Sequence, residues 1–304
     1  RDQDDISIEV KLSSDQNQSS RWLVGAYYAE IERDVAVSYG ADLGKGFEYK
    51  SYVPASGKNP TDLMFDDSFN TDVFSIFGQY SVDLSDVTEL SLEGRYDKEK
   101  RSVNNNVPGV ASALYYGGGA PINPAMAAVG DTIPSRDKSF DQFQPKISLT
   151  TTGENTTVYA SYGVGFRSGG FNSSGSAATT EFWLNSGNPF GLGVVGAQLG
   201  VSDTFKKEVS KSFELGFKGR YLDGRLEVNG AIFETDVDDN QFFEFFAGPW
   251  GLLRVVTNID QLDISGSELD FKYAVSDNLT LDGGLGFTDG EIKKNAHRPN
   301  TVGN

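Results

Sequence analysis

The residue types that most enzymes use for covalent or acid–base chemistry are nearly absent from this chain. It contains no cysteine and one histidine, His297, beside Arg298 and Pro299. Thiolate chemistry, disulfides and cysteine-ligated metals are therefore excluded, and neither a serine–histidine–acid triad nor a multi-histidine metal site can form within the chain. Carboxylates are plentiful, but none lies in a recognisable acid–base setting. The sequence therefore predicts that the chain is not an enzyme.

Two segments come close to known ligand-binding loops. Residues 163–168 read Gly-Val-Gly-Phe-Arg-Ser, which approaches a dinucleotide fingerprint, but Ser168 replaces the third glycine and no helix is expected to follow. Residues 236–240 read Asp-Val-Asp-Asp-Asn, the opening spacing of a calcium loop, yet Gln241 and Ala247 stand where a glycine and a bidentate acid are required. We expect an acidic hairpin end there, with at most weakly bound calcium, and no resident cofactor or metal.

Basic and aromatic residues are the better candidates for ligand contact. Arg167 ends a predicted strand on its polar side, where it could meet an anionic ligand or pair with an acid such as Glu214. Trp183 lies in a predicted loop, which favours contact with an external partner. An aromatic cluster is interpreted first as an interfacial belt and second as an apolar ligand platform at the mouth of a barrel: Phe242, Phe243, Phe245, Phe246 and Trp250.

Amphipathic strands must position these residues. In residues 212–221, Phe213 and Leu215 alternate with Glu214 and Lys218, so that one face is apolar and the other is charged. Ten strands of this kind are expected, near residues 6–13, 21–33, 71–84, 87–96, 140–151, 156–166, 212–221, 226–235, 265–275 and 279–287. Tight turns join them alternately with long connections, at 34–70, 98–138, 168–206 and 236–262, and no helix is expected between them.

Short periplasmic turns alternating with long extracellular loops are typical of outer-membrane β-barrels. Aromatic residues such as Tyr96 and Phe287 end the apolar faces, and glycines such as Gly94 lie on them, where they would relieve curvature. A soluble β-sandwich also has one apolar and one polar face, but it explains neither feature. The prediction is an all-β fold: an antiparallel up-and-down transmembrane β-barrel, of which this chain forms about ten strands.

Composition narrows the function classes. The formal net charge is -17 over 304 residues, which argues against nucleic-acid binding. Hydrophobic residues make up 38% and aromatic residues 12%, which suits a barrel wall because only one face of each strand is apolar. No apolar run of about 18 residues could form a transmembrane helix. The acidic, glycine-rich long connections disfavour a highly anionic ligand.

Three segments resemble signatures of the TonB-dependent outer-membrane receptors. They are residues 159–172, which read Tyr-Ala-Ser-Tyr-Gly-Val-Gly-Phe-Arg-Ser-Gly-Gly-Phe-Asn, residues 211–226 with the following Asn240-Gln241, and residues 265–269. These segments have the order and spacing of that family. The resemblance is strongest from residue 139 to residue 304.

The resemblance implies a barrel of about 22 strands around an N-terminal plug. It also implies import of a scarce nutrient, such as a ferric siderophore, energised by the TonB complex through a motif near the receptor's N-terminus. On this interpretation, residues 1–304 are a single partial domain in the bacterial outer membrane, without the plug and the last strands. Two alternatives stay open: a non-energised barrel or adhesin that acts as a binding module, and a secreted β-rich glycan-active enzyme.

Overall fold

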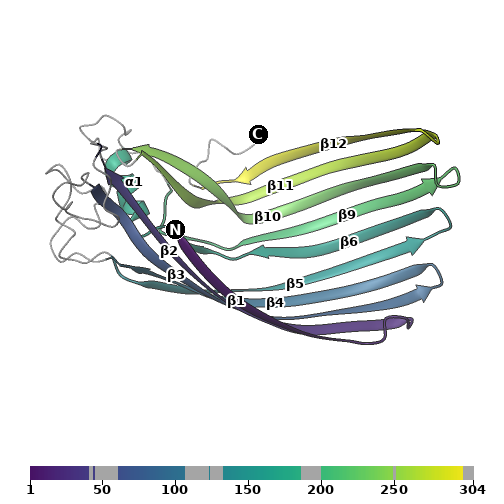
Figure 1. Cartoon of the computed structure of the whole chain (residues 1–304), viewed down its shortest axis with the longest axis horizontal. Helices are drawn as coiled ribbons and strands as arrows, with labels where there is room; N and C mark the ends of the chain where they lie inside the picture. Colours follow the sequence, from purple (N-terminus) through teal and green to yellow (C-terminus); the bar gives the residue numbers. More distant parts are fainter. Residues whose placement is uncertain are drawn as a thin grey trace.

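The computed structural model describes residues 1–40, 44, 61–106, 123, 133–185, 200–248 and 251–296. Ten long strands form one antiparallel sheet in chain order (Figure 1). They are β1 (Asp2–Ser13), β2 (Ser20–Gly40), β3 (Thr61–Ser85), β4 (Thr88–Asn105), β5 (Arg136–Thr152), β6 (Thr156–Arg167), β9 (Glu208–Tyr221), β10 (Leu226–Gly248), β11 (Gly251–Ser276) and β12 (Leu279–Lys294). The short strands β7 (Gly170–Phe171) and β8 (Thr204–Phe205) pair with each other.

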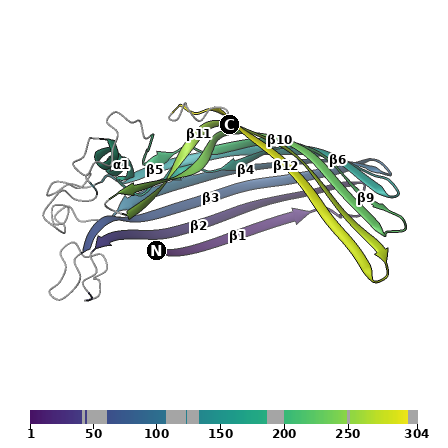
Figure 2. The ribbon, with the colours of Figure 1, turned by 90° about the horizontal axis from the view of Figure 1, so that it is seen from above.

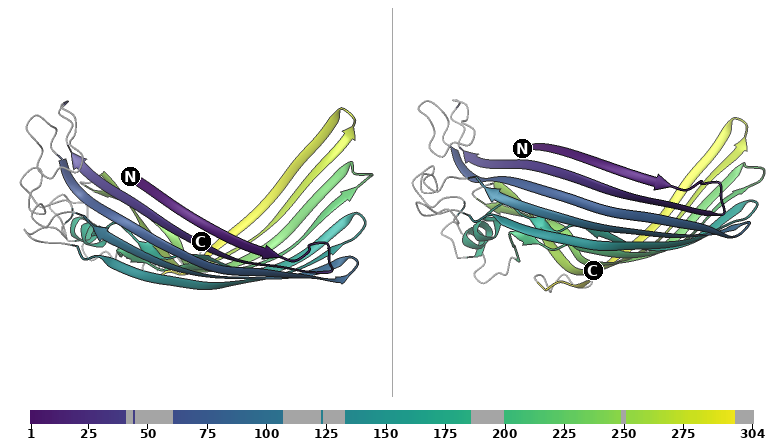
Figure 3. Two further views of the ribbon diagram at one scale, coloured as in Figure 1. Left: turned by 60° about the horizontal axis from the view of Figure 1, so that its bottom comes forward. Right: turned by 90° about the horizontal axis from the view of Figure 1, so that it is seen from below.

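The sheet is a curved, open wall. Every strand pairs with its sequence neighbours, except that β6 pairs with β9 across the segment that contains β7 and β8. The strands β1 and β12 form the two edges, and the described residues do not close the sheet between them (Figures 2 and 3). Short turns lie at one end of the wall, and helix α1 (Ser176–Thr180) lies at the other (Figure 1). The predicted all-β meander is confirmed as part of a larger barrel.

The apolar sides of the strands share one face, which we call the outer face. In register across four strands, Phe217, Gly230, Leu269 and Leu285 lie side by side on it. Apolar side chains on this face are exposed: Leu285 is 77% exposed, and Ile76 on β3 is 50% exposed. No second sheet covers this face in the described part of the chain. A soluble sandwich would bury the same residues, so the exposed face fits hydrocarbon contact.

The opposite face, the inner face, carries the charges. Arg21 forms an ion pair with Asp83 at 2.9 Å and a second one with Glu89. Farther along the wall, Tyr159 donates a hydrogen bond of 2.6 Å to Glu214. Polar side chains therefore satisfy one another along a surface that can face water. Among the described residues, no helix is long and apolar enough to cross a membrane.

Several predicted boundaries are wrong at the end that carries the long connections. β10 runs to Gly248 and β11 starts at Gly251, so most of the predicted connection 236–262 is a continuous β-hairpin. Its aromatic and β-branched residues favour strand and keep the two strands in register. Helix α1 and a π-helical turn, Glu181–Asn185, also form where no helix was expected.

The turn between β9 and β10 consists of residues 222–225, as the predicted strand bounds imply, with positive φ at Leu222, Asp223 and Gly224. The glycine at position 219 makes room for a ring, because a Cβ there would lie 2.5 Å from Tyr221 atoms. Glycines on the outer face thus admit neighbouring aromatic rings, in addition to any effect on curvature.

Candidate functional site

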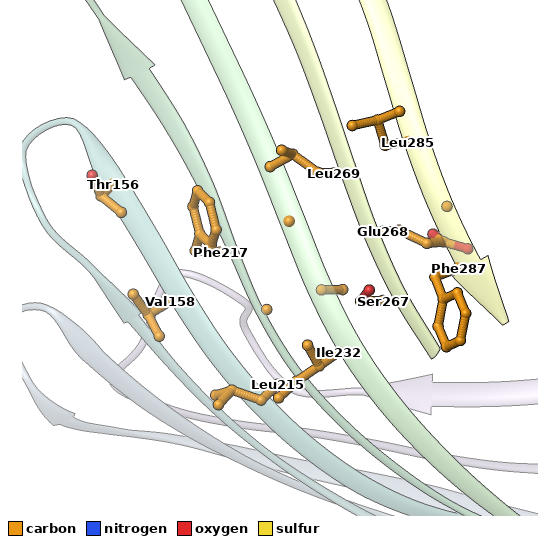
Figure 4. A pocket seen from close by; sticks show the side chains of 14 residues that line it. Thr156, Val158, Leu215, Phe217, Ile232, Ser267, Glu268, Leu269, Leu285 and Phe287 are labelled. Carbon is orange, nitrogen blue, oxygen red and sulfur yellow. The ribbon is translucent and has the colours of Figure 1, made fainter. Parts of the chain in front are cut away.

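One hollow lies on the outer face and does not suit a polar ligand. Its volume is about 730 Å³, and its walls are mostly aliphatic and aromatic (Figure 4). Leu215, Ile232, Leu269 and Phe287 are among the side chains that surround it. Since few polar groups point into this hollow, it lacks the convergent donors and acceptors of a specific binding site.

A second cavity, which we call the mouth cavity, lies on the inner face near the end with the long connections. Its volume is about 560 Å³, and β1 to β4 contribute to its lining together with residues 171–173, β8, β10 and β11. Four arginines and four phenylalanines line it: Arg1, Arg33, Arg101, Arg254, Phe69, Phe171, Phe205 and Phe243. No aspartate or glutamate is among the described residues that line it. In a chain of net charge -17, this cavity is locally basic.

Arg33 on β2 is held by an aromatic ring rather than by a carboxylate among the described residues. Its guanidinium lies over the Phe69 ring, with Cζ 4.5 Å from the ring centroid. Its buried Nε atom has no hydrogen-bond partner among the described residues. Burial, and then the neighbouring charges of Arg1 and Arg101, lower the pKa of Arg33, although an arginine side chain stays charged. An anion in the cavity would relieve this repulsion.

Arg254 on β11 provides a second available charge. Its Cζ lies 3.7 Å from the centroid of the Phe243 ring, a cation–π contact that holds the side chain in place. Neither Arg254 nor Arg33 forms an ion pair with another described residue, whereas Arg101 lies 2.7 Å from Glu99. The cavity thus presents two guanidinium groups, each supported by an aromatic ring, that no carboxylate of the described residues neutralises.

The part of the hairpin that carries Phe243 and Arg254 extends past its neighbours. β9 pairs with β10 only as far as Asp238, and β12 pairs with β11 only as far as Gln261. Beyond these points, residues 239–248 and 251–260 pair only with each other, and we call this two-stranded part the ribbon. An isolated two-stranded ribbon is marginally stable, so other contacts must hold it.

The segment after β6 folds inward and provides such contacts. We call residues 168–185 the mouth loop. The backbone N–H of Ser174 donates to the Asp67 carboxylate on β3 at 2.8 Å. The Asp203 carboxylate accepts from Gly175 N–H at 3.1 Å and from Ala177 N–H at 2.8 Å, which caps the start of α1. These carboxylates fix the mouth loop beside the cavity.

Arg136 on β5 ties these anchors to the wall. Its Nη1 lies 3.3 Å from the Asp203 carboxylate, and its Nη2 donates to the Ser174 hydroxyl at 3.2 Å. Burial raises the pKa of Asp67, although the hydrogen bonds from Ser174 and Asn105 partly oppose that effect. The mouth loop therefore depends on buried polar groups that lie far apart in the sequence.

A family model described as TonB dependent receptor-like, beta-barrel, matches residues 2–304. The chain belongs to the TonB-dependent receptor family. A curated relative, the probable TonB-dependent receptor BfrD of Bordetella pertussis, is 24% identical over 237 residues, which are 77% of this chain and 26% of that protein. The chain thus spans about a quarter of the length of this relative.

Solved structures of the family share the fold of this receptor barrel. The ferric-catecholate import receptor Fiu from E. coli K12 matches 99% of this chain and 40% of its own, with a TM-score of 0.62 at 18% identity. The ferric yersiniabactin uptake receptor FyuA from Yersinia pestis matches 95% of this chain and 35% of its own, with a TM-score of 0.61 at 14% identity. These relatives are outer-membrane transport receptors and not enzymes, so the outer face meets lipid and the inner face lines the lumen.

The receptor barrel buries one of the predicted contact residues. Trp183 is only 6% exposed and packs in a cluster with Phe65, Leu253 and Val255. Its ring also meets Phe182 edge-on, at a centroid distance of 5.1 Å. The expectation that Trp183 is open to an external partner is therefore wrong. The indole instead joins the mouth loop to the ribbon and to β3.

Arg167 lies near the ribbon but does not line the mouth cavity. Its Nη1 is 3.7 Å from the Glu208 carboxylate and donates a long hydrogen bond of 3.5 Å to the Gln241 carbonyl. The suggested partner Glu214 instead accepts from Tyr159. Arg167 thus helps to fix the base of the ribbon, and its contact with a ligand stays a prediction.

The aromatic cluster is divided between the two faces of the ribbon. Phe243 lines the mouth cavity, whereas Phe242 and Phe245 are 52% and 59% exposed and do not line it. Phe242 lies about 30 Å farther along β10 than Ile232, where the apolar stretch of that strand ends. Both the interfacial belt and the ligand platform stay predictions. Trp250 and His297 lie outside the described residues.

The acidic segment at residues 236–240 is part of β10 and does not form a loop. The Asp238 carboxylate lies 2.9 Å from Lys211, and the Asp239 carboxylate lies 2.8 Å from Lys206. In the described ranges, no group of three or more histidine, aspartate or glutamate residues could hold a metal. Two of the carboxylates in the calcium-like spacing, Asp238 and Asp239, are therefore paired with lysines.

Sequence reasoning missed the arginines of the mouth cavity. Arg33 is the last residue of a predicted strand and lies on its polar, lumen-facing side, but Arg101 and Arg254 fell in segments predicted as long connections. If the strand that ends near residue 96 is extended to Arg101, the alternation places Arg101 on the inner face as well. That signal could not show that the ribbon brings Arg254 to the same cavity.

Proposed function

We propose that this receptor barrel serves the TonB-energised uptake of an anionic ferric chelate, such as a ferric siderophore, across the outer membrane. The observation that carries the proposal is the mouth cavity, where Arg33 and Arg254 present charges that no described carboxylate neutralises. Guanidinium groups bind carboxylate, catecholate or phosphate oxygens by charge-assisted hydrogen bonds. The neighbouring phenylalanines provide apolar surface for the organic part of the chelate.

The solved relatives support the ligand class at the level of the fold. Two of them are uptake receptors for ferric catecholates and for ferric yersiniabactin. The charge of the long connections pointed away from an anionic ligand, but the side chains that line the mouth cavity are a different and basic set. The local lining is the better guide, because electrostatic attraction is strongest at the contacting groups.

An uptake assay with radioactive iron tests this function in the full-length receptor. Cells that lack the receptor gene are complemented with the wild-type gene and supplied with ferric catecholate, hydroxamate and carboxylate chelates. We expect uptake of at least one anionic chelate to require both the receptor and TonB. Uptake that persists without TonB would instead favour a non-energised barrel, and no receptor-dependent uptake would reject the proposal.

Arginine variants then test the site. Removing a charged hydrogen-bonding partner costs about 1.5–3 kcal/mol, so Arg33→Gln or Arg254→Gln should weaken binding of the transported chelate by about 10- to 100-fold. Arg220→Gln is the matched control, because Arg220 pairs with Glu227 at the turn end of the wall, far along the strand from the cavity. Equal affinity for all three variants would show that the mouth cavity does not bind the chelate.

A further inference from the structure

One side chain of the mouth loop forms hydrogen bonds to the backbone of the ribbon. The Asn172 carboxamide binds the backbone of Val256 on β11 at both polar atoms: Oδ1 accepts from Val256 N–H, and Nδ2 donates to Val256 C=O, each at 2.8 Å. The same Nδ2 donates to the Ser202 carbonyl at 2.8 Å. Asn172 is only 6% exposed, so these three bonds are shielded from water. The amide thus takes the place of a third strand beside the ribbon.

Val256 lies beside two other ribbon residues that line the mouth cavity, Phe243 and Arg254. It lies opposite Phe243 in the ribbon, two positions from Arg254, and all three side chains line the mouth cavity. Further polar contacts lie near the base of the ribbon, where Gln241 Nε2 donates to Ser168 C=O at 2.8 Å and Asn258 Nδ2 donates to Asp239 C=O at 2.7 Å. Asn172 binds farther along the ribbon, at a residue that itself lines the cavity.

We propose that Asn172 is a positioning residue that holds the ribbon, with Phe243 and Arg254, against the rest of the mouth cavity. The role in ligand binding rests on the proposed function, whereas the placement of the ribbon does not. The glycines before Asn172 support this assignment. A Cβ at Gly169 would overlap the Phe140 ring, and a Cβ at Gly170 would lie 2.8 Å from the Phe205 ring, so the backbone must approach closely here.

The isosteric variant Asn172→Asp tests the hydrogen bonds without changing the shape. At neutral pH its carboxylate would face the carbonyl oxygens of Val256 and Ser202, so the ribbon should detach from the mouth loop. At acidic pH the protonated carboxyl group has one donor and one acceptor, and it can bind both polar atoms of Val256 as the amide does. A merely structural lesion would not recover in this way.

Spin labels on two introduced cysteines measure the position of the ribbon in the full-length receptor. Leu252→Cys marks the ribbon, where the leucine is 67% exposed, and Glu32→Cys marks β2. This chain has no cysteine of its own, and any cysteine elsewhere in the receptor is replaced by serine. Double electron–electron resonance then gives the distribution of distances between the labels, without any ligand.

We expect one narrow distribution in the labelled wild type. Asn172→Asp should broaden or shift it at pH 7 and restore it at pH 4.5. Asn229→Asp, the same chemical change on the inner face of β10, should leave it unchanged. An unchanged distribution in Asn172→Asp at pH 7, or one that stays broad at both pH values, would overturn the assignment.

Two further measurements keep the outcome clear. If Asn172→Asp does not assemble, hydrogen exchange in the wild type decides: the Val256 amide, which donates to Asn172 Oδ1, should exchange as slowly as the amides of the wall, and exchange within seconds would overturn the assignment. Binding of ferric tris-catecholate at pH 7 should weaken about tenfold in Asn172→Asp, and unchanged affinity would deny the role in binding. If the wild type does not bind this probe, the proposed ligand class fails, whereas the spin-label result still decides the placement.

Discussion

The wall and the mouth of this receptor barrel are built from the same strands but are stabilised in different ways. On the wall, strand alternation determines which face each residue occupies. Ile76 is 50% exposed because this face contacts lipid rather than protein. At the mouth, the mouth loop buries polar residues such as Ser174 and Thr179, which are each 1% exposed. The wall therefore depends on which face a residue occupies, whereas the mouth depends on specific hydrogen bonds and close contacts.

The largest effect should come from a charge placed on the wrong face of the wall. Ile76→Arg puts a guanidinium on the outer face of β3 within the apolar stretch, which should lower the free energy of unfolding by about 2–4 kcal/mol. Gln79→Arg, on the inner face of the same strand opposite Glu93, should change it by less than about 1 kcal/mol. Urea unfolding of the full-length receptor from lipid vesicles measures both values.

The comparison between these two variants decides the orientation of the wall. Equal destabilisation by Ile76→Arg and Gln79→Arg would mean that both faces are buried in similar surroundings. In that case the outer face would not be in hydrocarbon, and the assignment of the inner face to the lumen would also fail.

A methyl group added at the mouth should have the next largest effect. In Gly169→Ala the new Cβ would overlap the Phe140 ring and lie 2.6 Å from the Phe205 carbonyl oxygen. Relieving such a clash costs about 1–3 kcal/mol, and the loss should be confined to the mouth loop. Hydrogen exchange of residues 168–185 is the measurement.

Gly290→Ala is the matched control for this change. A Cβ at Gly290 on β12 would meet no atom within 4 Å, so the substitution should be neutral or slightly stabilising. If Gly169→Ala leaves exchange of the mouth loop unchanged, the close contacts with Phe140 and Phe205 do not exist in the protein.

The wall could be predicted from sequence, and the mouth could not, for a physical reason. Alternation with a period of two residues is a local signal, so the faces of Ile76 and Glu214 follow from their neighbours. The mouth depends on contacts such as Ser174 to Asp67, which are separated by 107 positions, and local patterns carry no information about them.

The segment that ends at Asn172 shows the same limit. Its resemblance to a family signature identified the strand and the following loop, but not the bond from the Asn172 carboxamide to Val256. Trp183 was misplaced for a related reason, since a loop position says little about burial when the loop folds into a lumen. Long-range topology has to be known before such side chains can be placed.

The smallest effect, and the one most specific to the mouth, should come from neutralising Asp67. Burial raises the pKa of this carboxyl group in the folded mouth, so the folded state binds the proton more tightly than the unfolded state does. The stabilisation that this proton provides is fully present below the ordinary pKa and is lost as the pH rises through the raised value. The mouth loop should therefore be held more firmly in acid than at neutral pH.

Asp67→Asn should remove this pH dependence and change the stability of the mouth loop at pH 7 by less than about 1 kcal/mol, because the amide oxygen still accepts from Ser174 N–H. Asp67→Ala is the control for the hydrogen bond itself: it leaves that buried N–H without an acceptor and should cost about 1 kcal/mol or more. Hydrogen exchange of residues 174–180 at pH 5 and pH 7.5, corrected for the intrinsic rates, compares the three proteins. If Asp67→Asn keeps the full pH dependence of the wild type, another titrating group controls the mouth, and the buried carboxylate is not what distinguishes it from the wall.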